Sequence, residues 1–193
     1  DLEETRLRTD LESYDWLVFL PMPDGFGAYN RYYGRLKDGS VKVRGIASRR
    51  GDTPEYIRQA QAGMLDLLGR ASSRHEINEV SNAVREQYRD AMDGLRNASP
   101  QEMAIHRQVS RLDYSRSCPE ASAVRACRAA GIPVSPGMEI GYVIRDAGRW
   151  AVDLSWEADG FDVSYYQALL DRAWHEIEFS LREARAGTGT TPR

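Results

Sequence analysis

The stretch YNRYYGRLKDGSVKVRGIASRRGDTPEYIR, residues 29–58, predicts a β-hairpin that leads into a helix. The turn is expected at residues 37–40, KDGS, because Asp-Gly is a strong signal for a tight hairpin turn. Alternating side chains on either side of this turn are typical of strands, so the strand pair carries Arg35, Lys42 and Arg44.

The residues after the hairpin carry the signals of a helix start. Asp52 or Thr53 is expected to cap the helix with its side chain, and Pro54 suits the first turn. Glu55 then lies near the positive end of the helix dipole.

Two zones of the chain are basic although the whole chain carries a net charge of −3. Residues 30–58 contain eight arginines or lysines against three acidic residues, and residues 106–128 contain five arginines against two. The rest of the chain therefore carries −11. An acidic body with two basic zones that also contain tyrosine predicts a surface for a polyanion. The alternative is a solvated, salt-bridged hairpin, since surface arginines are common.

The remaining segments predict an antiparallel sheet near the N-terminus and helices after it. Further strands are expected at 14–20, 103–109 and 138–145, and alternation at Leu7, Thr9 and Leu11 would suit one more. Residues 149–160 are expected to be irregular, and the tail at 187–193 to be disordered. Helices are expected at 53–68, 74–96, 119–130 and 163–186.

Length and composition are those of a globular protein with one large domain or two small ones. No run of about 18 apolar residues is present, so no membrane span is expected. Cys118 and Cys127 are nine residues apart without a CxxC pair, and we expect free thiols in a reducing cytoplasm.

Several motifs, in order along the chain, resemble the end of the palm and the thumb of archaeal family B DNA polymerases. In that family a Lys-x-Tyr-like strand, a hairpin, an Arg-Gly segment and an Arg-Arg-x-Asp segment lead into the thumb. The matching residues here are Asn30-Arg31-Tyr32, Asp38-Gly39, Arg44-Gly45 and Arg49-Arg50-Gly51-Asp52. Residues 109–144 resemble the thumb itself, and residues 162–166 resemble the segment before its final helix.

The resemblance implies an α+β fold with a small antiparallel palm-type sheet, about residues 1–50, and a mostly helical thumb with a short strand pair. The palm edge would span 1–52 and the thumb 53–186. The implied function is to grip primer–template duplex DNA. The implied DNA-binding residues form a hairpin zone, namely Asn30, Arg31, Tyr32, Lys42, Arg44, Arg49 and Arg50, and a loop zone, namely Ser110, Arg111, Tyr114, Ser115 and Arg116.

Each of these assignments has a structural alternative. Tyr32 and Tyr114 would otherwise serve packing, and Arg49 and Arg50 would otherwise pair with acidic residues of the helices. Asn30-Arg31-Tyr32 also departs from the Lys-Lys-Tyr that is usual in the family, which removes one expected cation.

Nucleotidyl transfer needs two metal ions held by clustered carboxylates, and no D-x-D motif on a strand is found here. The resemblance places the polymerase aspartates upstream of the matched segment. The chain is therefore expected to bind no cofactor and to be inactive alone, while Mg²⁺ is implied for the complete polymerase. The expected partner is the remaining palm, fingers and exonuclease part, with this chain as a fragment or as the small subunit of a split enzyme. The alternative is a non-catalytic DNA-binding or scaffold module derived from an inactivated polymerase paralogue.

Overall fold

The computed structural model describes residues 12–21 and 27–186. It contains two three-stranded antiparallel sheets and four α-helices, so the predicted α+β fold class is confirmed. The expected strand at residues 7–11 and the expected disordered tail at 187–193 lie outside the described residues. The elements are β1 (Tyr14–Pro21), β2 (Gly27–Leu36), β3 (Val41–Arg44), η1 (Ala47–Arg49), α1 (Glu55–Leu68), α2 (Arg74–Gly94), η2 (Leu95–Asn97), η3 (Pro100–Met103), β4 (Ile105–Gln108), α3 (Pro119–Ala129), β5 (Glu139–Asp146), β6 (Ala151–Leu154) and α4 (Val163–Ala186).

The first sheet has the order β1-β2-β3, and its hairpin turn lies where the sequence predicted it. The Gly39 N–H donates to the Leu36 carbonyl at 2.9 Å, and Gly39 has a φ of +89°, which favours glycine. Asp38 Oδ1 accepts a hydrogen bond from the Ser40 N–H at 2.9 Å and closes the turn.

A second glycine lets the chain leave the hairpin. Gly45 has a φ of +65°, and a Cβ placed on it would lie 2.0 Å from the Asn30 carbonyl oxygen. The close approach of this segment to β2 therefore requires a residue without a side chain.

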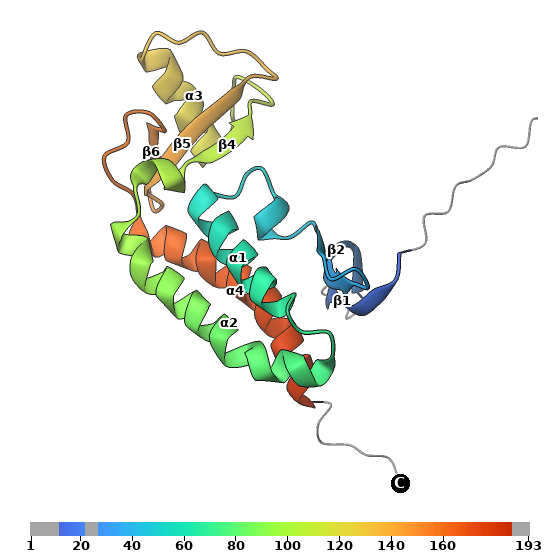
Figure 1. Cartoon of the computed structure of the whole chain (residues 1–193). Helices are drawn as coiled ribbons and strands as arrows, with labels where there is room; N and C mark the ends of the chain where they lie inside the picture. The colour runs from blue at the N-terminus through green and yellow to red at the C-terminus, as the bar shows by residue number, and fades with distance from the viewer. Residues whose placement is uncertain (1–11, 22–26, 187–193) are drawn as a thin grey trace, which may run out of the picture.

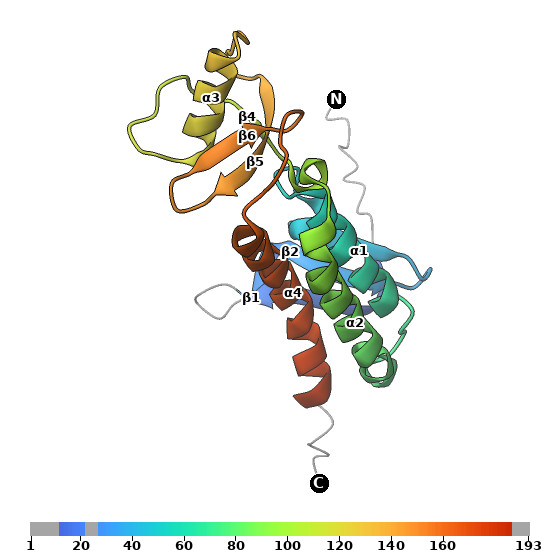
Figure 2. The same ribbon diagram turned by 90° about the vertical axis from the view of Figure 1, so that its left-hand side faces the viewer.

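Helices α1, α2 and α4 form the central body, and the first sheet lies against one side of it (Figures 1 and 2). The predicted apolar stripes of these helices face each other in the core. Representative core residues with no exposed surface are Ile57, Met64, Val84, Leu170 and Ile177.

The second sheet has the order β4-β5-β6 and lies with α3 at one end of the molecule (Figure 1). The expectation that residues 149–160 are irregular was wrong at β6, which pairs with β5 over Ala151–Leu154. Trp150, with a φ of +52°, ends the turn that lets the chain fold back as this third strand. Pairing with β5, and not local sequence, creates this strand.

Hydrogen bonds join the second sheet to α4. The Ile144 N–H donates to the Tyr166 hydroxyl at 2.9 Å, and the Asp162 N–H donates to the Ile144 carbonyl at 2.8 Å. Both Ile144 and Tyr166 are fully buried, so β5 is fixed to the start of α4.

Within the described residues, no helix has both the length and the apolar character that crossing a bilayer requires.

Candidate nucleic-acid interface

The register of the hairpin decides which of its cations share a face. Tyr32 lies opposite Arg44, and Gly34 lies opposite Lys42, so Tyr32, Lys42 and Arg44 share one face of the sheet. The other face carries Tyr33, which is fully buried against the helices. Lys42 and Arg44, two of the three predicted cations of this strand pair, are therefore brought together on the side that faces away from the core.

Arg35 is on the opposite face from Lys42 and Arg44. Its Nε donates to the Gly69 carbonyl at 2.8 Å, and its guanidinium also pairs with Asp15. Arg35 therefore anchors the first sheet to the end of α1 and does not extend the basic face.

Three cations of the hairpin zone have carboxylate partners within the chain. Arg31 Nη2 lies 2.7 Å from Glu176 Oε1 on α4, and Arg50 makes two bonds of 3.0 Å to Asp52. Lys42 pairs with Glu12, whose hydrogen bond raises the pKa of the lysine. The three cations are more exposed than a buried ion pair would be, and salt bridges with an exposed member contribute little to stability.

The other charged members of the hairpin zone are more open. Arg44 and Arg49 are exposed, and neither has an ion pair within the described residues. Asn30 is also exposed, and Tyr32 is half-buried beside the ring of Phe19. Tyr32 thus makes an aromatic contact within the sheet, as the packing alternative expected, and is still partly exposed.

A polar junction holds the segment that carries Arg49. Glu176 accepts hydrogen bonds from the Ala47 N–H at 3.0 Å and from Gln61 Nε2 at 2.7 Å. Gln61, fully buried, accepts from the Ser48 N–H at 2.6 Å. Two helices therefore fix the backbone just before Arg49, because a buried side-chain network of this kind has few alternative arrangements.

The loop zone follows β4 directly. Its first residues are fixed because Val109 exchanges two backbone hydrogen bonds of 2.8 Å with Met138 and Gly137. Beyond that point the Arg111 guanidinium lies 5.3 Å from the centre of the Tyr114 ring, a cation–π contact. Ser110, Ser115 and Arg116 are exposed. The loop thus presents cationic and hydroxyl groups to solvent from a fixed base.

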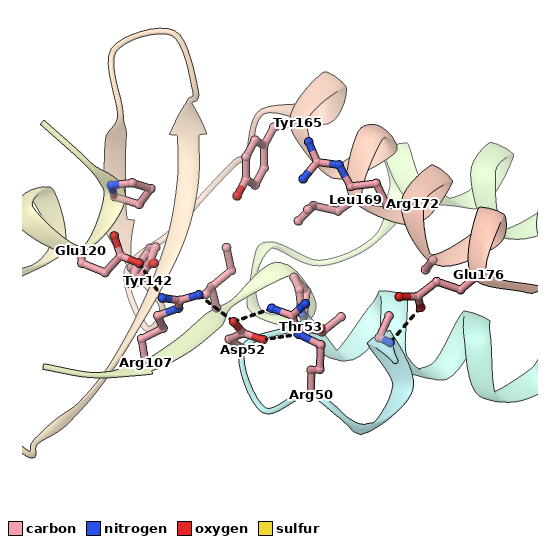
Figure 3. Close-up of a pocket in the computed structure, with 15 residues that line it drawn as sticks. Arg50, Asp52, Thr53, Arg107, Glu120, Tyr142, Tyr165, Leu169, Arg172 and Glu176 are labelled. Atoms are coloured by element: carbon pink, nitrogen blue, oxygen red, sulfur yellow. Dashed lines mark hydrogen bonds and ion pairs between the residues drawn. The ribbon is translucent and has the colours of Figure 1, made fainter. Parts of the chain in front are cut away.

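A cleft of about 270 Å³ lies between the two zones, where α4 and the start of α1 meet β4 and α3 (Figure 3). Arg107 on β4 joins its walls, since its two terminal nitrogens lie 2.7 Å from Asp52 and 3.1 Å from Glu120. Hydrogen bonds from Arg50 and Arg107 hold the pKa of Asp52 below its usual value.

The expectation that Asp52 or Thr53 caps α1 was wrong. The N-cap residue is Pro54, and no side chain makes a capping bond there. The Asp52 carboxylate is instead used by Arg50 and Arg107. Sequence reasoning missed Arg107 as a member of this group, because only its place in a basic zone marked it and its partner lies 55 residues away.

The resemblance implies Mg²⁺ only for a complete polymerase. In the described part of the chain no group of three or more His, Cys, Asp or Glu residues is placed to share a metal ion. Cys118 and Cys127 are both free thiols.

Known proteins similar to this chain are archaeal DNA polymerases. DNA polymerase 1 of Sulfolobus acidocaldarius is 29% identical over 142 residues, which cover 69% of this chain and 16% of the relative. A DNA polymerase of Thermococcus sp. (strain 9oN-7) is 24% identical over 141 residues, which cover 72% of this chain and 18% of the relative. This chain thus spans less than one fifth of the length of these relatives. No protein-family model matches it.

A solved structure shares the fold. The family B DNA polymerase of the hyperthermophilic archaeon Pyrobaculum calidifontis superposes with a TM-score of 0.60 at 22% identity, over 80% of this chain and 20% of that one. The resemblance to archaeal family B DNA polymerases that the sequence motifs predicted is therefore confirmed.

Proposed function

We propose that this chain is the DNA-binding palm-edge and thumb portion of a family B DNA polymerase, and that it grips primer–template duplex. The observation that carries this proposal is the similarity to archaeal DNA polymerases over 69% and 72% of the chain. The palm edge would comprise residues 1–52 and the thumb residues 53–186. Template-directed addition of dNTPs, in replication or repair, would belong to the complete polymerase.

The chemistry of both zones supports binding to the DNA backbone. Arginine and lysine neutralise phosphates, while serine and tyrosine hydroxyls add positioning contacts that read no sequence. A polymerase has to hold every sequence equally, which these side chains allow. Tyr32, Lys42 and Arg44 share a face, as a surface that follows one strand requires.

The resemblance assigns each zone a part of the duplex. The hairpin zone would lie beside the primer strand near its 3′ end. The loop zone would hold the minor-groove side of the newly made duplex, with Arg111 stacked on Tyr114. Lys42 would exchange Glu12 for a phosphate when DNA binds.

Catalysis would need residues beyond those described here. We propose that the metal-binding aspartates belong to the remaining palm, which would act together with the fingers and exonuclease parts in the same or a separate polypeptide. The role of this chain is then to hold DNA, and alone it would be inactive. Free thiols and similarity to DNA polymerases support a cytoplasmic location.

Competition between labelled primer–template duplex and single strand of equal length tests the binding role. We expect the duplex to be preferred, and Arg182→Ala, an exposed residue of α4 paired with Glu178, to leave affinity unchanged. Equal affinity for both forms would contradict a duplex grip. Absence of binding even at low salt would favour the scaffold module instead.

Primer extension tests the inactivity. With primer–template, dNTPs and Mg²⁺, we expect this chain alone to incorporate no nucleotide. Incorporation that persists after repeated purification would show that the chain contains its own catalytic residues.

A further inference from the structure

The cleft between the two zones contains three guanidinium groups from three separate parts of the chain. Arg50 follows η1, Arg107 lies on β4, and Arg172 projects from α4. Figure 3 shows Arg172 reaching toward Tyr165, across the cavity from the group formed by Arg50, Asp52 and Arg107.

The carboxylates of the cleft are already used by other donors. Asp52 accepts from both Arg50 and Arg107, and Glu120 pairs with Arg107. Glu176 accepts from Arg31, from Gln61 and from a backbone N–H. Each of these acids therefore has its cation or its hydrogen bonds without Arg172.

Arg172 is the surplus cation of the cleft. It is exposed, and within residues 12–21 and 27–186 no hydrogen bond or ion pair to its guanidinium is found. A guanidinium carries five N–H donors in a fixed fork that matches the oxygens of a phosphate. Nearby lies the hydroxyl of Tyr165, which is a neutral hydrogen-bond donor at pH 7 because the pKa of tyrosine is about 10 and burial raises it further.

The size and charge of the cleft limit what it can hold. A volume of about 270 Å³ lies below the range of roughly 300–1,000 Å³ that is usual for whole small-molecule ligands. With Arg31, which pairs with Glu176, four guanidinium groups accompany three carboxylates, and this balance of +1 matches the single negative charge of a phosphodiester. The cleft therefore suits one phosphate of a strand that continues outside it, and not a complete nucleotide.

The position of the cleft links it to the DNA-binding surface. Arg50 is a member of the hairpin zone, and Arg107 precedes the loop zone by three residues, about 10 Å along an extended chain. A DNA strand advances 3.4 Å along its axis for each phosphate. A strand that contacts both zones would thus pass the mouth of the cleft within a few nucleotides.

We propose that the cleft is a third phosphate-binding point, centred on Arg172, for the DNA strand that runs between the two zones. This assignment rests on the proposed grip of duplex DNA. The same chemistry would accept free inorganic phosphate, so the experiment has to separate the two sources.

The test compares Arg172→Ala with Arg182→Ala, an exposed arginine of the same helix that is paired with Glu178. Binding of primer–template duplex is measured by anisotropy at several salt concentrations. We expect Arg172→Ala to weaken binding about tenfold. The slope of log affinity against log salt concentration should become shallower by about 0.9, the value for one lost phosphate contact. Arg182→Ala should behave as the wild type.

A second arm titrates both proteins with inorganic phosphate alone and follows the melting temperature. The proposed phosphate point would be overturned if Arg172→Ala has the wild-type slope of log affinity against log salt concentration while Arg44→Ala has a shallower one. That result would leave the proposed DNA grip intact. If phosphate then raises the melting temperature of the wild type only, the cleft holds a free anion. If the wild type does not bind duplex DNA at all, the proposed function is refuted, and the proposed phosphate point in the cleft is refuted with it.

Discussion

The hydrogen-bond partners of Asp52 show that a residue distant in the sequence can determine the role of a side chain. It accepts from Arg50, two positions earlier, and from Arg107, which lies on a strand of the other sheet. Local sequence favours a helix cap at this position, because Asp before Pro and Glu is a common start signal. The two arginines offer charge-assisted bonds, which are stronger than a capping bond to a backbone N–H.

Asp52→Asn should destabilise the protein in a pH-dependent way. Because the two arginines lower the pKa of Asp52 in the folded state, its contribution is present above the unfolded pKa, near 4, and is lost as the pH falls through the folded pKa. We expect a loss of about 1–2 kcal/mol in the free energy of unfolding at pH 7. Urea unfolding at pH 7 and near pH 3 measures this difference, which should shrink in acid.

Asp66→Asn is the matched control for that prediction. Asp66 is exposed on α1 and has no ion pair in the described part of the chain. Its substitution should change stability by less than about 0.5 kcal/mol at either pH. A loss for Asp52→Asn that is equally large in acid would contradict the assigned ion pairs.

The two neighbouring tyrosines of α4 make a second test at this scale. The Tyr166 hydroxyl accepts from the buried Ile144 N–H, so Tyr166→Phe would leave that donor unsatisfied and cost about 1–3 kcal/mol. Tyr165→Phe should cost less, since no hydrogen bond of its hydroxyl is found in the described residues. Chemical denaturation of both variants compares them, and equal losses would contradict the link between β5 and α4.

At the scale of elements, sequence patterns predicted those helices, strands and turns that depend mainly on their own residues. The Asp38-Gly39 turn, the strand at Tyr14–Pro21 and the long helices α2 and α4 all lie where periodicity and turn residues predicted them. Strand β6 could not be predicted in this way, since it exists through pairing with β5 and has only four residues. The cap of α1 was also predicted wrongly, because the outcome depended on Arg107.

The contrast between two helix starts is measurable. Ser73 caps α2 and accepts from the Glu76 N–H, whereas Thr53 makes no capping bond at α1. Ser73→Ala should therefore cost about 0.5–2 kcal/mol, and Thr53→Ala should be close to neutral. Thermal unfolding followed by circular dichroism distinguishes them. A larger loss of stability for Thr53→Ala than for Ser73→Ala would show that Thr53 caps α1 after all.

Gly45 governs the exit from the hairpin. Gly45→Ala would place a Cβ against the Asn30 carbonyl at a positive φ, and we expect it to cost about 2 kcal/mol or more. Gly51→Ala is the control, since a Cβ there meets no atom within 4 Å. Urea unfolding of the two variants should separate clearly. A stable Gly45→Ala protein would mean that the segment after β3 can move away from β2.

At the scale of the whole molecule, a basic sheet face and a basic loop are held on one body by three helices and by the Arg107 bridge. The sequence predicted the two zones and their order along the chain. It could not predict that Arg35 leaves the basic face, or that a cleft lies between the zones, because both depend on how the units pack.

The most direct test of the central claim is the salt dependence of duplex binding by the wild type, Arg44→Ala, Arg111→Ala and the double variant. Each arginine that contacts a phosphate contributes about 0.9 to the slope of log affinity against log salt concentration. We predict that each single substitution lowers the slope by about that amount, and that the double substitution lowers it by about twice as much, because one duplex contacts both zones. Wild-type slopes in both single variants would contradict the account and show that these arginines do not contact DNA.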